Sequence, residues 1–133
     1  MRIATTTALS ALLAAVAAGS SAEPFELPGE YRPSPQLAEG LYVCRNDRTI
    51  SHSLDFSANG TYSMPELSAG GGNFRLGPDG SFEWLSGPFA ASEGDAVTIR
   101  GMNARRAADR EPVIVLLYDM PGVESHDYCF REG

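Results

Sequence analysis

A 20-residue repeat in the middle of the chain constrains the fold more than any other feature. Gly40-Leu41-Tyr42, Gly60-Thr61-Tyr62 and Gly80-Ser81-Phe82 follow one another at intervals of 20 residues. Asn59 and Asp79 precede the second and third of these triplets, and Asn-Gly and Asp-Gly favour the positive φ angles of tight hairpin turns. The flanking residues alternate between apolar and polar, as in strands with one buried face. The pattern predicts consecutive hairpins that form an antiparallel meander.

This alternation predicts about eight short strands. They are expected at Leu41–Arg45, Ile50–Phe56, Thr61–Met64, Asn73–Leu76, Ser81–Leu85, Ala96–Arg100, Pro112–Tyr118 and Asp127–Arg131. Residues 112–118 are a continuous apolar run, which predicts burial on both faces, whereas the Ala- and Arg-rich residues 102–110 are expected to form an exposed loop. The fold class is therefore all-β, a small antiparallel barrel of about eight strands, with a sandwich as the alternative.

Aromatic residues predict how the interior of the barrel is occupied. The predicted strands between residues 50 and 85 carry five of them, namely Phe56, Tyr62, Phe74, Phe82 and Trp84. In so small a barrel they favour an interior filled by side chains over a hollow one. Trp84, the single tryptophan, is interpreted as core filling, with an aromatic floor for a ligand at the barrel mouth as the alternative.

Cys44 and Cys129 are the only cysteines, and they lie on the first and last predicted strands. In an exported protein two cysteines usually form a disulfide, and here it would fasten the two ends of the sheet together. The alternative is a reactive or metal-binding pair. The chain has neither the Cys-x-x-Cys spacing nor the surrounding histidines that such chemistry uses.

Residues 1–22 have the pattern of a secretory signal peptide. Arg2 is their only charged residue, an apolar Ala-rich run covers 8–18, and Ser20 and Ala22 fit the small-residue positions before a cleavage site. A retained membrane anchor is the alternative, although the apolar run is shorter than the ~20 residues that span a bilayer. The expected location is the bacterial periplasm or the extracellular medium. The richness in Ala and the absence of lysine favour a GC-rich bacterial source.

Beyond the signal peptide, the chain is expected to consist of two parts. Residues 23–39 contain four prolines and should form an extended arm that lies on the barrel or trails from it, and residues 40–133 should form the single barrel domain. Loss of Arg2 on cleavage changes the net charge from −7 to −8. An acidic chain is a poor nucleic-acid binder, and its charge favours a basic protein partner as well as solubility.

The residues used by common enzymes do not form a convincing pattern. His126 lies in Ser125-His126-Asp127, but neighbours in sequence do not adopt the geometry of a catalytic triad, and no Gly-x-Ser-x-Gly motif is present. A metal site built from His126, Asp127 and Asp119 is an open alternative. His52, the other histidine, has polar neighbours on a predicted strand. We therefore predict a non-enzymatic protein without a cofactor.

One cluster of basic residues stands out because the chain as a whole is acidic. Arg105, Arg106 and Arg110 fall close together in the segment predicted to be a loop. A solvated loop is the simplest interpretation, and binding of an anion or an acidic partner is the alternative.

Part of the sequence resembles periplasmic inhibitors of c-type lysozyme, which are small disulfide-closed β-barrels. The resemblance rests on Leu41-Tyr42-Val43-Cys44, on residues 62–74 with Ser68-Ala69-Gly70, on Phe82-Glu83-Trp84-Leu85-Ser86-Gly87 and on Cys129, which occur in a similar order. It covers about half of the mature chain. It implies an inhibitory loop that begins at Ser68-Ala69. Gly70 and Ser86 stand where that family has a second serine and a lysine.

These observations define one candidate surface and three functions. The candidate partner-binding residues are Ser68, Ala69, Gly70, Asn73, Trp84 and Ser86. The predicted function is an exported binding module for a protein, with a small ligand as a further option. The alternatives are an inhibitor of a c-type lysozyme or similar basic cell-wall hydrolase, and a periplasmic accessory subunit of a membrane complex, attached through the arm or through an uncleaved N-terminal helix. The inhibitor alternative requires that residues 68–73 and the 85–87 turn lie side by side at one barrel end.

Overall fold

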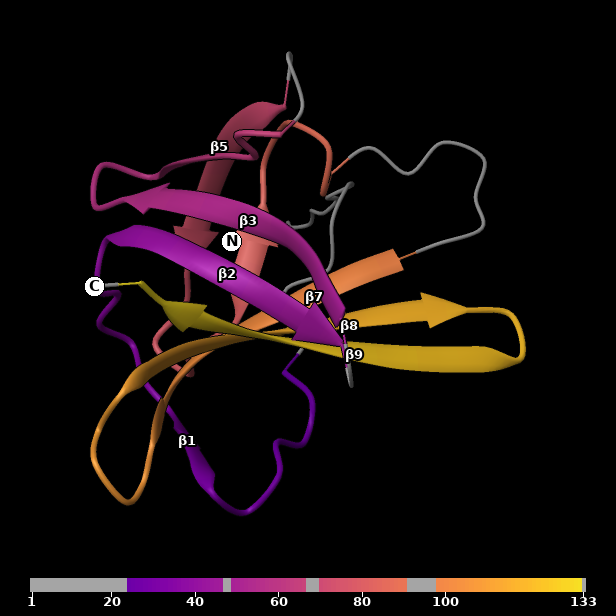
Figure 1. The fold of residues 1–133 in the computed structure, drawn as a ribbon. Coiled ribbons are helices and arrows are strands. Elements are labelled where there is room, and N and C mark those ends of the chain that lie inside the picture. Colours follow the sequence, from indigo (N-terminus) through magenta and orange to yellow (C-terminus); the bar gives the residue numbers. More distant parts are fainter. Residues whose placement is uncertain (1–23, 47–48, 67–69, 91–97, 133) are drawn as a thin grey trace, which may run out of the picture.

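Nine antiparallel strands form one curled sheet in the computed structural model, which describes residues 24–46, 49–66, 70–90 and 98–132 (Figure 1). The strands are β1 (Tyr31–Pro33), β2 (Gly40–Asn46), β3 (Thr49–Ser57), β4 (Thr61–Ser63), β5 (Gly71–Leu76), β6 (Phe82–Trp84), β7 (Thr98–Arg106), β8 (Pro112–Met120) and β9 (Val123–Arg131). Their order in the sheet is β1-β7-β8-β9-β2-β3-β4-β5-β6. No helix occurs among the described residues. The all-β antiparallel fold class is confirmed.

The predicted hairpin turns are present where the sequence repeats. The β3–β4 turn contains Gly60 at φ 94°, and the β5–β6 turn contains Gly80 at φ 87°. Both conformations strongly favour glycine. In each turn the glycine amide donates to the carbonyl three residues earlier, that of Ser57 and that of Gly77. The second and third triplets of the repeat therefore mark hairpin turns, whereas Gly40 of the first triplet is the first residue of β2.

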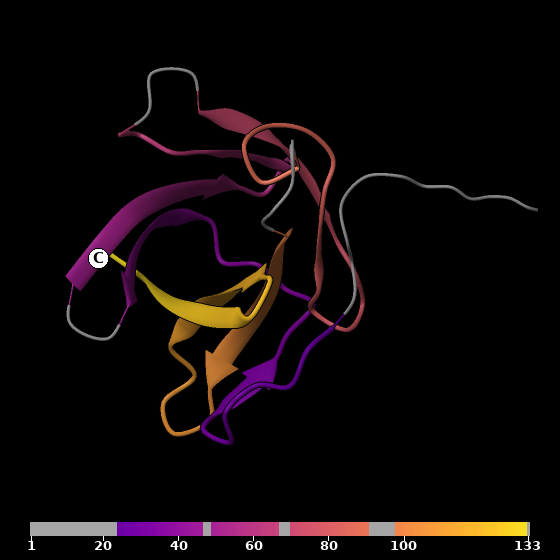
Figure 2. The same ribbon diagram turned by 90° about the vertical axis from the view of Figure 1, so that its right-hand side faces the viewer.

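The sheet curls, so that β6, the final strand in the sheet order, comes close to β7 (Figure 2). Ser81, just before β6, forms an isolated bridge with Met102 on β7. The amide of Asn103 donates to the carbonyl of Gly80 over 2.7 Å. The curled sheet is therefore a half-barrel, in which a short contact links the start of β6 to β7.

The interior of the barrel is filled by side chains, as the aromatic content predicts. Phe82 and Trp84 stack at 4.8 Å between ring centroids, and Phe56 lies against both. Gly101 on β7 lets the strand approach, because an added Cβ would lie 2.8 Å from the Trp84 ring. The larger buried set comprises Tyr42, Cys44, Leu54, Phe56, Tyr62, Phe74, Phe82, Trp84, Phe89, Ile114, Leu116 and Cys129.

The Pro-rich arm lies on the outside of the barrel and contributes β1, a strand that the sequence pattern did not predict. Tyr31 is 8% exposed and stacks on Tyr128 at 5.8 Å between centroids. It joins Val113 and Val115 in a second apolar cluster on the outer face. Because the arm covers one face of β8 and the barrel core covers the other, β8 is buried on both sides, as its apolar run predicts.

The prediction of an exposed loop over residues 102–110 was wrong. Residues 102–106 belong to β7, and Met102, Asn103 and Ala104 are buried; the turn to β8 occupies 107–109. Ala104 is small enough to pack beneath the arm, and Asn103 fixes the arm through hydrogen bonds. Within the described part of the chain, no helix is long and apolar enough to cross a bilayer.

Candidate functional site

The predicted surface residues Asn73 and Ser86 lie side by side at one edge of the β5–β6 hairpin. The Ser86 hydroxyl accepts a hydrogen bond from the Asn73 amide at 2.9 Å and donates to Asn73 Oδ1 at 3.2 Å. The Asn73 carbonyl accepts from the amide of Leu85 at 2.9 Å. This adjacency follows from the register, because Phe74 and Trp84 are paired directly.

Two glycines allow the backbones to cross at this edge. A Cβ added at Gly72 would lie 2.1 Å from the Ser86 carbonyl oxygen, and one at Gly87 would lie 2.6 Å from the Gly71 carbonyl oxygen. Gly87 also has a φ of 90°, in the region that favours glycine. Any side chain at either position would push the two segments apart.

Tyr62 supports the same edge from inside the barrel. Its hydroxyl donates to the Ser86 carbonyl at 2.9 Å and accepts from the amide of Phe89 at 3.0 Å. Burial raises the pKa of the Tyr62 phenol, so the hydroxyl remains protonated at neutral pH and can act in both bonds. The edge is therefore a fixed surface rather than a loose loop.

The apolar side chain at this edge is Leu85, which is not among the partner-binding residues predicted from sequence. Leu85 is 46% exposed, one of two exposed large hydrophobic residues in the described part of the chain. Trp84, a predicted partner-binding residue, is 1% exposed and packs in the core. Side chains alternate in direction along a strand, which explains why Trp84 is buried and Leu85 is exposed. Phe82 and Trp84 point inward, so Leu85, the residue after Trp84, points outward. Strand alternation is thus the signal that could have found it.

The remaining predicted surface residues are only partly described. Gly70 lies next to the edge, and its carbonyl accepts from the amide of Met64. Ser68 and Ala69 lie outside the described residues. The side-by-side arrangement required of residues 68–73 and the 85–87 turn is therefore present for residues 71–73.

A groove of about 450 Å³ runs beside this edge. It lies across β3, β4 and β5 and is lined by Asp55, Ser57, Thr61, Tyr62, Ser63, Gly72 and Asn73. The side chains of these residues include hydroxyl groups, one amide and one carboxylate. We refer to Gly70, Asn73, Leu85 and Ser86, together with this groove, as the β5–β6 edge.

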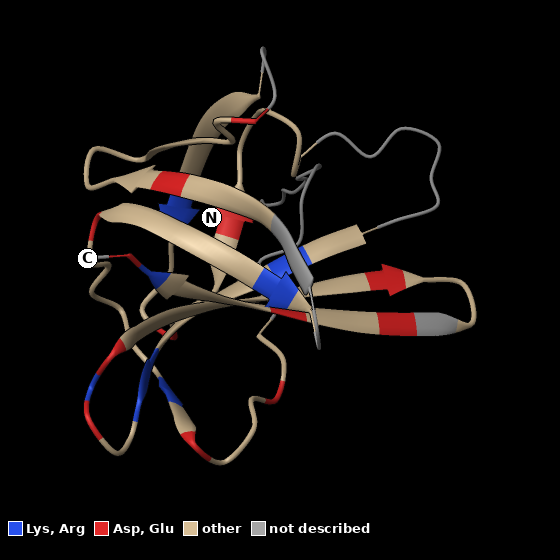
Figure 3. Ribbon diagram, in the orientation of Figure 1, with Lys and Arg blue, Asp and Glu red and all other residues tan. Residues whose placement is uncertain are grey.

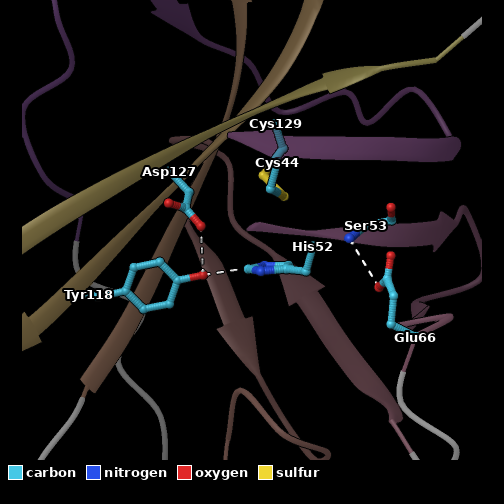
Figure 4. The surroundings of a disulfide bond; sticks show 7 residues. All are labelled: Cys44, His52, Ser53, Glu66, Tyr118, Asp127 and Cys129. Carbon is cyan, nitrogen blue, oxygen red and sulfur yellow. Dashed lines mark hydrogen bonds between the residues drawn. A yellow bond between two sulfur atoms is a disulfide. The ribbon is translucent and has the colours of Figure 1, made fainter. Parts of the chain in front are cut away.

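A second polar group lies inside the barrel near the disulfide, shown in Figure 4. The hydroxyl of Tyr118 donates to Asp127 Oδ2 at 3.2 Å, and its oxygen is 3.3 Å from His52 Nε2. Burial lowers the pKa of His52, which is therefore neutral at pH 7. Burial, reinforced by the Asp127 charge, raises the pKa of Tyr118. These shifts favour a neutral imidazole and a protonated phenol that are hydrogen-bonded to each other.

The histidines do not form the catalytic or metal arrangements considered from sequence. Asp127 is 2% exposed and belongs to the interior, whereas its neighbour His126 lies on the outer face, within 6.2 Å of the Phe25 and Tyr128 rings between centroids. Asp119 pairs with Arg100 at 3.4 Å. Across the described ranges, no three His, Cys, Asp or Glu residues are grouped to hold a metal ion.

The predicted disulfide between Cys44 and Cys129 is present. Both residues are fully buried, and they are directly paired between β2 and β9. His52 is paired with Cys44 on the other side, so His52 and the two cysteines lie in one row across β3, β2 and β9. No family profile, curated protein or solved structure matches this chain.

Proposed function

We propose that this chain is an exported, non-enzymatic binding module that recognises a protein partner through its outer surface. The observation that carries the proposal is the filled interior. Phe56, Phe82 and Trp84 are each at most 1% exposed and are stacked on one another, which leaves no room for a ligand between them. A small ligand of the kind that occupies hollow barrels is therefore disfavoured, and recognition falls to surface groups.

The β5–β6 edge is the surface best suited to this task. Leu85 provides an exposed apolar side chain, and Asn73 and Ser86 provide hydrogen-bonding groups beside it. Protein interfaces combine an apolar centre with a polar rim in this way. Because Gly72, Gly87 and Tyr62 fix the backbone, little conformational entropy is lost when a partner binds.

Two features support export. The buried disulfide suits an oxidising compartment, and residues 1–22 have the composition of a signal peptide. A net charge of −8 after loss of Arg2 would accelerate association with a basic partner. The bacterial periplasm and the extracellular medium both fit these properties.

Inhibition of a c-type lysozyme or a similar basic cell-wall hydrolase is the second candidate. The observation that favours it is the contact between residues 71–73 and the 85–87 turn, which is part of the arrangement that the resemblance requires. Attachment to a membrane complex through the arm has less support. Tyr31 and Leu27 of the arm already pack on the protein's own barrel, so the arm is not available as a separate tether.

The test is capture of partners from a native envelope extract by the mature chain, residues 23–133, followed by mass spectrometry. We expect a basic protein that is retained at low salt, is weakened at higher salt and is lost from the Leu85→Arg variant. Leu41→Arg is the matched control, because Leu41 is the other exposed large hydrophobic residue, at 36%. Equal capture by both variants, or no salt-sensitive partner, would contradict the proposal.

A direct assay separates the second candidate from the first. Purified c-type lysozyme is mixed with the mature chain, and lysis of bacterial cell walls is followed by turbidity. Inhibition that is weakened by Gly70→Asp supports the inhibitor function, because the added carboxylate lies at the proposed contact. Undiminished lysis at an excess of the mature chain would exclude it while leaving the binding module intact.

A further inference from the structure

Four arginines line one groove where the arm meets the β7–β8 hairpin. The groove has a volume of about 390 Å³, and its lining consists of Arg32, Pro33, Ser34, Arg105, Arg106, Ala107 and Arg110. No carboxylate residue belongs to this lining. In Figure 3 the basic segments of β1 and β7 lie close together there, on a chain whose net charge is −7.

The pairing of β1 with β7 places two of these charges directly opposite each other. Arg32 and Arg105 are direct cross-strand partners in the antiparallel register. Like charges in this position destabilise a sheet unless a counter-charge lies near them. An anion bound between the two side chains would turn this repulsion into two favourable interactions.

Three of the four guanidinium groups have no carboxylate partner among the described residues. Arg32 donates to the backbone carbonyls of Gly29 and Tyr31, and Arg105 donates to that of Arg110. Each guanidinium has further N–H donors in a planar fork. These three groups are therefore paired with no carboxylate of the described fold, and Arg32 and Arg105 are already oriented by backbone contacts.

Nearby acidic residues are either engaged or outside the lining. Asp109 binds Arg106 through both of its oxygens, at 3.1 and 3.2 Å. Arg106 also lies over the Phe130 ring, 5.4 Å from its centroid, which leaves Arg106 as a structural residue. Glu30 and Glu111 are close in sequence to the groove but do not line it.

The turn that holds Arg110 has a fixed conformation. Its amide donates to the Arg106 carbonyl at 2.7 Å, and the Arg106 amide donates to the Glu111 carbonyl at 2.9 Å. Arg110 has a φ of 64°, the only positive value at a non-glycine among the described residues. Residues other than Gly, Asn and Asp are uncommon in this region of positive φ. The hairpin therefore keeps an arginine at the groove despite an unfavourable backbone conformation.

We propose that this arginine groove binds the phosphate group of a small phosphorylated molecule. Guanidinium forks match phosphate oxygens in geometry, and charge-assisted hydrogen bonds to them are strong. The acidic residues outside the groove repel long polyanions. A compact anion interacts mainly with the charges within a Debye length of about 10 Å. A nucleic acid is therefore a poor occupant and a small phosphate a good one. This inference is independent of the β5–β6 edge.

The test is isothermal titration of the mature chain with pyrophosphate at low ionic strength. Saturable binding is expected, with affinity reduced about tenfold by Arg105→Gln, since one charge-assisted contact is lost. Arg45→Gln is the matched control, because Arg45 is exposed on β2, away from the groove, and this variant should bind as the parent does. Absence of saturable heat up to about 10 mM pyrophosphate would overturn the proposal.

A second variant separates binding from folding. Arg110→Gly removes a charge and places glycine where φ is positive, so we expect weaker pyrophosphate binding with an unchanged or higher melting temperature. Parent-like binding by the Arg105→Gln/Arg110→Gly double variant would overturn the site. Titration with citrate tests whether the groove prefers phosphate to carboxylate. Equal affinity for citrate, with the same dependence on the variants, would replace phosphate by carboxylate as the ligand and overturn this assignment.

Discussion

Cys44 on β2 lies directly opposite Cys129 on β9, and the disulfide between them spans 85 residues of sequence. The bond joins the first hairpin of the meander to its last strand. Because β9 also pairs with β8, this single link connects the half of the sheet that contains the β5–β6 edge to the half that carries the arm. The disulfide therefore fixes the relative position of both proposed binding surfaces.

The Cys44→Ser/Cys129→Ser double variant should be less stable by about 4–5 kcal/mol, the chain-entropy estimate for a loop of this length. The measurement is equilibrium unfolding in urea under non-reducing conditions. Each single variant should lose a similar amount, because either one breaks the same bond. Clearly unequal losses would show that one cysteine stabilises the fold by other means.

Gly72→Ala should disrupt the β5–β6 edge. The new methyl group would lie 2.1 Å from the Ser86 carbonyl oxygen, which is backbone and can move only with the strand. We expect a loss of about 2–3 kcal/mol on urea unfolding, as for overpacked sites, together with weaker partner capture. Gly29→Ala is the control, because nothing lies within 4 Å of an added Cβ there. Similar effects of the two variants would argue against the close crossing.

The sequence predicted the hairpins because their signals are local. Asn59-Gly60 and Asp79-Gly80 set the turns, and alternation between them set which side chains are buried. Each of the eight predicted segments overlaps a strand of the structure. The adjacency of Asn73 and Ser86 follows from the same hairpin register. The structural features that are set by residues close in sequence could therefore be predicted from the sequence.

The elements that were missed depend on contacts between distant residues. β1 has three residues and ends in Pro33, so no alternation marks it, and it forms because Tyr31 finds an apolar surface on β8 and β9. Residues 102–106 lack a strand pattern, since Ala104 and Asn103 become buried only when the arm covers them. The arginine groove also depends on the long-range pairing of β1 with β7. From the sequence, only Arg105, Arg106 and Arg110 could be grouped together, because Arg32 is distant from them in the chain.

Stability should fall between neutral and mildly acidic pH because of His52. Burial holds the folded-state pKa of His52 below its usual value near 6.5, although the charges of Asp127 and Glu66 oppose the shift in part. A base with a lowered pKa contributes stability that is present above the unfolded pKa and lost as the pH falls through the folded pKa. Glu66 has a lowered pKa because it accepts from the Ser53 amide, and its contribution is lost only in a more acidic range, below about 4.5.

Urea unfolding at several pH values tests this assignment. His52→Gln should flatten the dependence of the free energy of unfolding on pH just below pH 6.5. His126→Gln, which removes the other histidine, on the outer face, is measured beside it for comparison. An unaltered slope in His52→Gln would assign the acid sensitivity to another group.

Asn103 should be one of the most sensitive positions of the fold. It is 1% exposed, and its side-chain amide donates to the carbonyls of Ser34 at 2.8 Å and Gln36 at 3.0 Å. Its backbone amide binds Gly80, so the residue connects the arm, β7 and the end of the β5–β6 turn. Asn103→Ala would remove the side-chain donor to the Ser34 carbonyl and the closer of two donors to the Gln36 carbonyl, and should cost about 2–3 kcal/mol.

Two further variants distinguish the lost hydrogen bonds from lost volume. Asn103→Asp preserves the shape but directs a carboxylate at the carbonyls of Ser34 and Gln36, so it should be more destabilising than Asn103→Ala at neutral pH and should recover in part when acid protonates it. Gln36→Ala removes an exposed side chain, keeps the accepting carbonyl and should change stability by less than about 0.5 kcal/mol. If Asn103→Asp were as stable as the parent chain at neutral pH, the amide of Asn103 would not be what fastens the arm, and the groove between Arg32 and Arg105 would need another support.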